Sequence, residues 1–260
     1  MTTPPLPTDP AAGTPGLLDV AALRARGVDR VLCVVAHPDD MEYGASAAVS
    51  AWTRAGITVS YLLLTRGEAG IRDLHPDEVA PLRAEEQRRA CARVGVEDLV
   101  IADLPDGLLE HTPATREVIA RRIREVRPQM VLTASWELEV GWGINHVDHR
   151  VACLSVVDAI RDADNPWLYP GLAADGLAAW KASTLLVTGA TTVTHLIPLD
   201  AEAVTAGTES LAAHRVYLEA LPDHPAPEVI VGEGTAVADK FRPVVPAEYA
   251  HALAVRVLEV

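Results

Sequence analysis

The chain has 260 residues, of which 49% are apolar and 22% charged, so it can bury a substantial core and stay soluble. Its formal net charge of -14 argues against the phosphate backbone of a nucleic acid as a partner, and equally against an anionic membrane surface. A small-molecule substrate remains open, because a local pocket can differ from the average surface.

The N-terminal segment, residues 1–16, is rich in proline and threonine and has neither the basic region nor the apolar core of a signal peptide. We expect this segment to be disordered and residues 17–260 to form a single α/β domain. No uninterrupted apolar run approaches the ~20 residues that cross a bilayer. The cysteines are odd in number and lie within predicted elements, which favours core packing over disulfides; they are Cys33, Cys91 and Cys153. We therefore expect a cytoplasmic protein.

Strand and helix patterns alternate along the chain after a short predicted helix at residues 17–26. Apolar, β-branched segments predict strands at 30–36, 57–64, 98–102, 129–134, 183–189 and 193–198. Helical periodicity predicts helices at 43–55, 78–94, 114–126, 148–161, 200–220 and 247–258. The first helices between strands have the length of crossover connections. The alternation therefore predicts an α/β fold, with a mostly parallel sheet and helices on both faces.

The first strand candidate ends in a cluster of chemically active side chains, Ala36-His37-Pro38-Asp39-Asp40. Pro38 cannot continue a sheet ladder, so the chain should turn outward there. In open α/β sheets, ligands bind beyond the carboxyl ends of the strands. One aspartate could simply cap the helix that follows. Capping needs only one acid, however, and this run offers two acids and a histidine, so we interpret it as part of a functional site.

A second cluster, residues 145–149 with the sequence Asn-His-Val-Asp-His, lies beyond the strand candidate at 129–134. It should reach the same edge of the sheet as His37. Asp148 could be a helix cap with incidental histidines. Combined with the first cluster, the two histidines and the acid favour a metal site. Imidazole and carboxylate ligands suit Zn²⁺, and the same donors would accept Fe²⁺, Co²⁺ or Ni²⁺.

A third stretch, residues 65–70 with the sequence Thr-Arg-Gly-Glu-Ala-Gly, follows the second strand candidate. Its glycines permit a tight turn beside a ligand, but it lacks the Gly-Lys-Ser/Thr ending of a phosphate loop. A plain turn explains the glycines without explaining Arg66 and Glu68 at the end of a strand, so both interpretations stay open. Asp106 lies in a predicted turn after the third strand candidate, which places another carboxylate at the carboxyl-end edge of the sheet.

Together these motifs resemble the PIG-L/LmbE-like family of zinc-dependent N-acetylglucosaminyl deacetylases, which includes deacetylases of mycothiol and bacillithiol pathways. The resemblance extends over about residues 28 to 165, and it is specific because the first motif is combined with the downstream His-x-Asp-His. It implies a Rossmann-like α/β domain. It also implies a hydrolase that removes an acyl group, in this family an acetyl group, from an N-acyl amino sugar or related amine.

The resemblance implies that His37, Asp40 and His149 hold one Zn²⁺ per chain. A metal ion in such a site polarises the amide carbonyl and lowers the pKa of water, which makes hydrolysis of an unreactive amide feasible.

The resemblance also implies catalytic roles for three residues outside the metal ligands. Asp39 would be the general base that takes a proton from the attacking water. His146 would stabilise the oxyanion or protonate the leaving amine, and Asp148 would orient His146.

Four further residues are weaker candidates for contacts with the substrate. The resemblance places Glu68, Arg72 and Asp106 near positions where family members contact sugar hydroxyls or other groups of the substrate, and a carboxylate such as Asp106 can accept hydrogen bonds from adjacent hydroxyls. His195 alternates with apolar residues on a predicted strand and could face the same crevice.

Other functions remain compatible with these residues. One is an amidase acting on a thiol-sugar conjugate or a natural-product intermediate, and another is a non-catalytic sugar-binding member of the fold. Asp39 favours an enzyme, because a binding module needs no acid that stands beside the metal without ligating it. The expected partner is a small N-acyl amino sugar or similar compound, without nucleic acid or membrane, and a homo-oligomer is compatible with the sequence.

Overall fold

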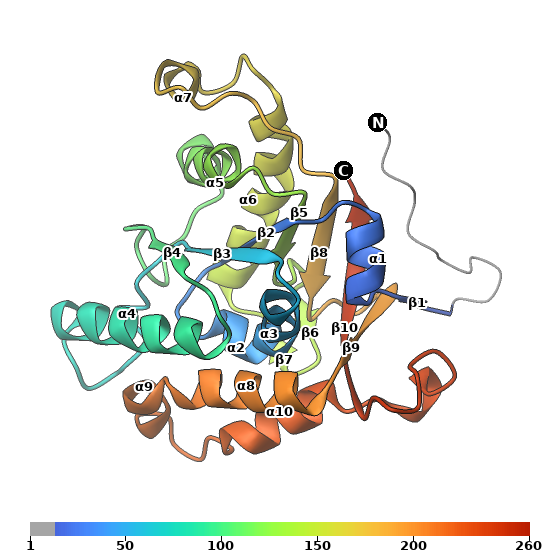
Figure 1. The fold of residues 1–260 in the computed structure, drawn as a ribbon. Helices are drawn as coiled ribbons and strands as arrows, with labels where there is room; N and C mark the ends of the chain where they lie inside the picture. Colours follow the sequence, from blue (N-terminus) through green and yellow to red (C-terminus); the bar gives the residue numbers. More distant parts are fainter. Residues whose placement is uncertain (1–13) are drawn as a thin grey trace.

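A mixed eight-stranded sheet crosses the described part of the chain, and helices cover both of its faces (Figure 1). The computed structural model describes residues 14–260, so residues 1–13 of the expected disordered segment lie outside the described residues. Gly16, at the end of that segment, already pairs with His195 in a short strand.

Seven of the eight strands run in the same direction. In spatial order the strands are β1 (Gly16–Leu17), β9 (His195–Leu199), β10 (His251–Glu259), β8 (Thr184–Thr188), β5 (Met130–Thr133), β2 (Arg30–Val35), β3 (Thr58–Leu63) and β4 (Asp98–Ile101). Only β10 is antiparallel to its neighbours. The prediction of a mostly parallel sheet is therefore confirmed.

The helices divide between the two faces of the sheet. They are α1 (Val20–Ala25), α2 (Asp40–Gly44), α3 (Ser46–Arg54), α4 (Pro76–Arg93), α5 (Pro113–Val126), α6 (Val147–Asp164), α7 (Pro170–Ala174), α8 (Ala201–Ala212), α9 (Arg215–Glu219) and α10 (Pro227–Thr235). Helices α5 and α6 pack against one face, whereas α1, α3 and α8 lie on the other (Figure 1). In β2, Val31 and Cys33 face one core and Leu32 and Val34 the other, which explains its continuous apolar run.

The predicted C-terminal helix at 247–258 is wrong, because residues 251–259 form strand β10 between β8 and β9. Its alanines favour a helix, but Leu253 and Val255 alternate into one core while Ala252 and Ala254 contact another cluster. Two ladders of backbone hydrogen bonds to neighbouring strands outweigh the local propensity. The predicted helix at 43–55 is divided at Ala45, whose backbone leaves the helical region.

The order of the strands positions the functional residues. From β2 the chain moves outward through β3 and β4, then returns to the other side of β2 as β5. The carboxyl ends of β2 and β5 thus flank a point where the direction of winding reverses, which is where open α/β sheets bind ligands. His37 follows β2. Residues 145–149 follow β5 by way of a small hairpin formed by β6 (Glu139–Val140) and β7 (Gly143–Ile144).

No helix within residues 14–260 combines the length and apolar character needed to span a membrane.

Candidate metal centre

The first motif turns outward directly after β2 without using its aspartates as helix caps. Asp39 occupies the N-cap position of α2 in a left-handed conformation with φ 95°, and its side chain makes no capping hydrogen bond. One oxygen of Asp40, Oδ2, accepts hydrogen bonds from the backbone N–H groups of Ala36 and His37, at 3.0 and 2.9 Å. The second oxygen of Asp40 is thereby held toward the centre of the site.

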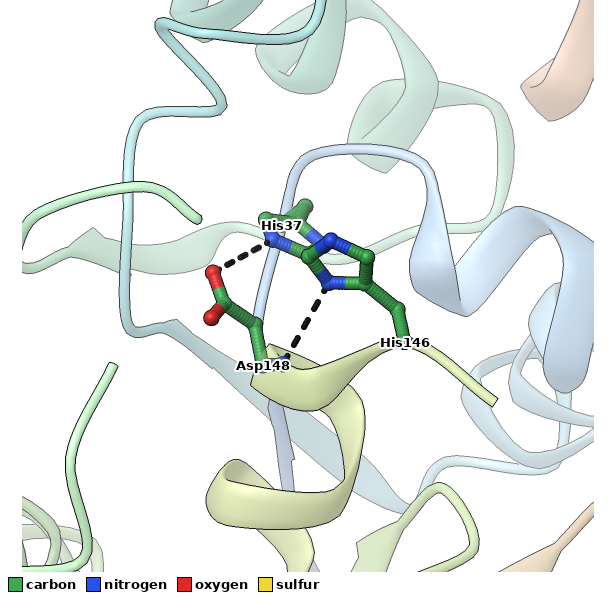
Figure 2. Close-up of side chains that lie close together, drawn as sticks. All are labelled: His37, His146 and Asp148. Atoms are coloured by element: carbon green, nitrogen blue, oxygen red, sulfur yellow. Dashed lines mark hydrogen bonds and ion pairs between the residues drawn. The ribbon is translucent and has the colours of Figure 1, made fainter. Parts of the chain in front are cut away.

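The second motif begins helix α6. His146 is the N-cap residue, and its Nδ1 accepts a hydrogen bond from the backbone N–H of Asp148 at 3.3 Å (Figure 2). The helix is therefore capped by His146 and not by Asp148, which leaves the carboxylate of Asp148 available for other contacts. His149 follows in the first turn and projects toward the first motif.

Three side chains from the two motifs converge on one point. Nδ1 of His37 lies 3.2 Å from Nε2 of His149, and this Nε2 lies 3.1 Å from Oδ1 of Asp40. The other oxygen of Asp40, Oδ2, which accepts the two backbone N–H groups, lies 3.7 Å from Nδ1 of His37. Ligand atoms about 2.1 Å from a tetrahedral metal ion lie about 3.4 Å from one another, so this donor set fits a single divalent ion.

The opposite nitrogen of each histidine is held by a hydrogen bond. Nε2 of His37 lies 3.0 Å from Oδ1 of Asp106 and 3.1 Å from Oδ2 of Asp148. Nδ1 of His149 lies 3.1 Å from Oδ1 of Asn145. Both contacts place the ring proton away from the convergence point and leave a lone pair directed toward it, as in metal sites whose histidines are oriented by outer partners. Asn145 is therefore a candidate functional residue; the sequence analysis included it in the second motif without giving it a role.

Negative charge is concentrated around His37, whose side chain is only 11% exposed. Burial lowers the pKa of His37, but the surrounding carboxylates raise it to about 12. Burial also lowers the pKa of His149, and Asp40 raises it above its usual value. The carboxylates around both rings therefore favour a positive charge at this point. A metal ion that binds here displaces the protons that the two histidines would otherwise carry.

The carboxylate of Asp148 contacts His37, whereas only the backbone N–H of Asp148 contacts the ring of His146, as Figure 2 shows. Its two carboxylate oxygens accept hydrogen bonds from the backbone N–H groups of Gly107, at 2.6 Å, and Leu109, at 3.1 Å. The role that the resemblance assigns to Asp148, orienting His146, is not the contact found here. The carboxylate of Asp148 instead connects the loop after β4 to His37 through these hydrogen bonds. A second set of donors, on His37, His146 and Asp148, is also close enough to hold a metal, but the backbone donors already occupy this carboxylate.

Asp39 is buried and bound to a residue that sequence reasoning missed. Nη2 of Arg83, on α4, lies 2.8 Å from Oδ2 of Asp39, and the guanidinium also donates to the carbonyl of Pro38. Burial raises the pKa of Asp39, and Arg83 opposes that increase. The ring of Tyr217 lies 3.8 Å from the guanidinium carbon of Arg83. Arg83 thus fixes the carboxylate proposed as the base.

Arg83 also explains the glycines of the third motif. A Cβ atom at Gly67 or Gly70 would come within 2.5 or 2.6 Å of Nη1 of Arg83. The two glycines therefore make room for a buried guanidinium, and the motif is not a plain turn. Arg66 points away from this contact and forms a surface ion pair with Asp103 at 3.2 Å.

A buried polar network supports the left-handed backbone of Asp39. Oε1 of Gln87 accepts the backbone N–H of Asp39 at 3.1 Å, and Nε2 of Gln87 donates to Glu42 at 3.2 Å. Glu42 in turn lies 3.4 Å from Nε2 of His214, which is completely buried after α8. The network links the first motif with α4 and with the segment after α8, and it offsets the strain of the positive φ.

Substitution of His214 by asparagine is expected to lower the free energy of unfolding by about 3–5 kcal/mol at pH 6, because it leaves the buried Glu42 without its charged partner. Burial lowers the pKa of His214, but Glu42 raises it above the usual value. The ionic contribution is thus complete below the unfolded pKa of about 6.5 and is lost as the pH rises through the higher folded pKa. Urea denaturation at pH 6 and pH 9 should show a smaller difference at pH 9. His75→Asn, at a 69% exposed position, is the control; a difference independent of pH would mean that the pair is not charged.

The four weaker substrate candidates separate into two that reach the site and two that do not. Asp106 contacts His37, and Oε1 of Glu68 accepts the backbone N–H of Asp106 at 3.0 Å. Arg72 is exposed in the loop before α4. His195 is buried at the first residue of β9. Since β9 runs in the same direction as β2, His195 lies at the opposite edge of the sheet from His37.

A pattern on the buried face of α4 could have identified Arg83 from the sequence. Val79, Arg83, Gln87 and Ala90 recur with helical spacing, and all four are buried. Charged and amide side chains on an apolar stripe must have buried partners. The abundance of exposed charges elsewhere in this helix conceals the pattern.

Comparisons with known proteins show the family that this chain resembles. Residues 32–160 match the model of the family described as PIG-L, GlcNAc-PI de-N-acetylase. A diacetylchitobiose deacetylase from Thermococcus kodakarensis is 36% identical over 142 residues, which cover 54% of this chain and 52% of that protein. A 1D-myo-inositol 2-acetamido-2-deoxy-alpha-D-glucopyranoside deacetylase from Kineococcus radiotolerans is 33% identical over 181 residues, which cover 53% and 49%. The chain therefore spans about half the length of these curated relatives.

Solved structures share the fold over most of the chain. N,N'-diacetylchitobiose deacetylase from Pyrococcus horikoshii superposes with a TM-score of 0.73 at 17% identity, covering 89% of this chain and 84% of that one. GalB, a 4-carboxy-2-hydroxymuconate hydratase from Pseudomonas putida, gives 0.66 at 17% identity, covering 89% and 96%. At this level of identity the likeness concerns the fold alone, and the second structure shows that one fold carries different reactions.

Proposed function

Because this chain belongs to the PIG-L family, we propose that it is a metal-dependent hydrolase that removes an acetyl group from an N-acetyl amino sugar or a related N-acyl amine. One observation carries the proposal. The donor atoms of His37, Asp40 and His149 converge, while the neighbouring Asp39 stays outside this donor set and is held by Arg83. A purely metal-binding or sugar-binding module has no need for that buried acid.

His37, Asp40 and His149 would hold the ion, and zinc is the metal we propose because two imidazoles and one carboxylate suit its open catalytic coordination. A bound zinc ion would supply Lewis acidity, polarising the amide carbonyl and lowering the pKa of water. Fe²⁺, Co²⁺ and Ni²⁺ are the alternatives that the same donors accept.

Asp39 would act as the general base. Its carboxylate adjoins the ligands in sequence and is raised in pKa by burial, which brings a carboxylate closer to the operating pH of a base. Arg83 keeps the carboxylate in one orientation, so its proton-accepting oxygen is positioned before the substrate arrives.

His146 would donate a hydrogen bond to the oxyanion as a neutral imidazole. Its pKa is lowered by partial burial and by the neighbouring His37. Since Nδ1 accepts the backbone N–H of Asp148, the ring proton is on Nε2, which is the free donor. A donor in this position typically contributes ~3–4 kcal/mol to the transition state.

The test is the release of free amine from N-acetylglucosamine, from N,N'-diacetylchitobiose and from a thiol-sugar conjugate. Each is assayed with protein stripped by chelator and then reloaded with Zn²⁺, Fe²⁺, Co²⁺ or Ni²⁺. We expect no turnover by the stripped protein and recovery with one of the metals, at about one ion per chain. Equal turnover before and after stripping would rule out a metal-dependent hydrolase.

A further inference from the structure

The hydrogen bonds of Arg83 do not by themselves hold its guanidinium in one orientation, although the residue is only 2% exposed. Nη2 donates to the carbonyl of Pro38 and to Oδ2 of Asp39, and Nη1 donates to the carbonyl of Gly67 over a long 3.4 Å. Nε is buried and has no hydrogen-bond partner among residues 14–260. Because a buried guanidinium normally uses all of its donors, another contact has to restrain this one.

The ring of Tyr217 supplies that contact. The guanidinium carbon of Arg83 lies over this ring, 3.8 Å from its centre. A Cβ atom at Gly70 would lie 2.6 Å from Nη1 of Arg83 and 3.5 Å from Cε2 of Tyr217, so the glycine turn and the ring together enclose the guanidinium. A guanidinium is planar and weakly hydrated, and its contact with an aromatic face is strongest when both groups are shielded from water. The ring therefore fixes the plane that the hydrogen bonds leave free.

The backbone that carries Tyr217 is anchored to the same helix as Arg83. The backbone N–H of Val216 donates to Oε1 of Glu86 at 2.6 Å. Glu86 lies one turn after Arg83 on α4 and is 4% exposed. Two residues before Val216, the completely buried His214 lies 3.4 Å from Glu42. These two anchors determine where the ring of Tyr217 lies.

The hydroxyl group of Tyr217 is within electrostatic reach of the same carboxylate that Arg83 binds. Burial raises the pKa of Tyr217 well above its ordinary value, and the carboxylate of Asp39 raises it further. The side chain is only partly buried. The ring and the hydroxyl therefore have separate surroundings, and variants can separate their contributions.

We propose that Tyr217 is a positioning residue for the catalytic base. Its ring holds the guanidinium of Arg83, and through it the carboxylate of Asp39, in a single orientation. This inference rests on the proposed function, in which Asp39 takes a proton from the attacking water. It extends the catalytic machinery to a helix, α9, that lies beyond the family match, which ends at residue 160.

The kinetic test compares Tyr217→Phe, which keeps the ring, with Tyr217→Leu, which removes it, in metal-loaded protein acting on N,N'-diacetylchitobiose. We expect the phenylalanine variant to keep kcat within about twofold of wild type. The leucine variant should lower kcat about 10- to 100-fold with little change in KM, because a misplaced catalytic group affects the reaction more than binding. Tyr249→Leu removes a partly buried ring from a separate apolar cluster and should behave as wild type. If the leucine variant does not fold, Tyr217→Met gives the same test with a more adaptable side chain.

Two kinetic results would overturn the proposal. An equal loss of kcat in the phenylalanine and leucine variants would show that the hydroxyl acts and not the ring. A higher KM with unchanged kcat in the leucine variant would show that the ring binds the substrate.

Crystal structures of the two variants give a measurement that does not depend on activity. We expect Arg83 and Asp39 to have one orientation each in wild type and in Tyr217→Phe, and more than one in Tyr217→Leu. A single, unchanged orientation of both side chains in the leucine variant would refute the positioning role, whatever the kinetics. If that variant shows several orientations while wild type hydrolyses no N-acetyl sugar, the proposed function fails and the contact between Tyr217 and Arg83 keeps its role in holding Asp39.

Discussion

Asp39→Asn is expected to lower kcat by about 10²- to 10⁴-fold while the protein still binds its metal. Asparagine keeps the shape of the side chain and cannot accept a proton, and the proposed ligands on either side of it in the chain, His37 and Asp40, are unchanged. The measurement is single-substrate kinetics on metal-saturated protein, together with metal analysis of the same sample. Asp103→Asn is the control, because this carboxylate lies at the same edge of the sheet and is 81% exposed.

The same substitution leaves Arg83 with a buried charge and no counter-ion. Breaking a buried ion pair by removing one partner costs about 3–5 kcal/mol, so the thermal midpoint should fall as well. Kinetics must therefore be recorded well below that midpoint. Turnover equal to wild type in folded, metal-loaded Asp39→Asn would remove Asp39 as the base.

His149→Ala and His37→Ala are expected to weaken metal binding by more than 100-fold and to abolish turnover. Loss of an outer partner typically costs 10- to 100-fold in metal affinity, and loss of a direct ligand costs more. Asn145→Ala removes the hydrogen bond to Nδ1 of His149, together with two hydrogen bonds to the carbonyls of Ser135 and Glu137, but no ligand, and should therefore fall in the 10- to 100-fold range.

Metal affinity is measured by competition with a chromophoric chelator, and metal content by mass spectrometry after dialysis. His75→Ala, which changes an exposed histidine before α4, should behave as wild type. Retention of about one ion per chain by both ligand variants would show that the ion binds elsewhere. The second donor set, which includes His146 and Asp148, would then be examined.

Sequence reasoning recovered strands β2, β3, β4, β5, β8 and β9 because the signals for those strands are local. The β-branched run of β2, the proline after it and the crossover-length helices each constrain the backbone within a few residues. The convergence of His37 and His149, more than a hundred residues apart, followed from one topological rule about the carboxyl ends of parallel strands.

The parts that escaped prediction depend on contacts distant in sequence. An alanine-rich segment becomes β10 because two strands need a partner between them, which no local window reveals. Arg83 is buried because Asp39, on another element, neutralises it. Asp148 binds His37 and two backbone groups of the loop after β4, and the spacing within its own motif could not show that.

The position of β10 has a consequence for how the protein is made. β8 and β9 are each hydrogen-bonded to β10 and not to each other, so the sheet consists of two separate parts until the segment 251–259 has been synthesised. All the strands that carry the candidate metal centre precede residue 189 and can assemble on the ribosome first. Until the last strand arrives, β8 has an open edge in the nascent chain, and this edge is where misassembly with other chains would begin.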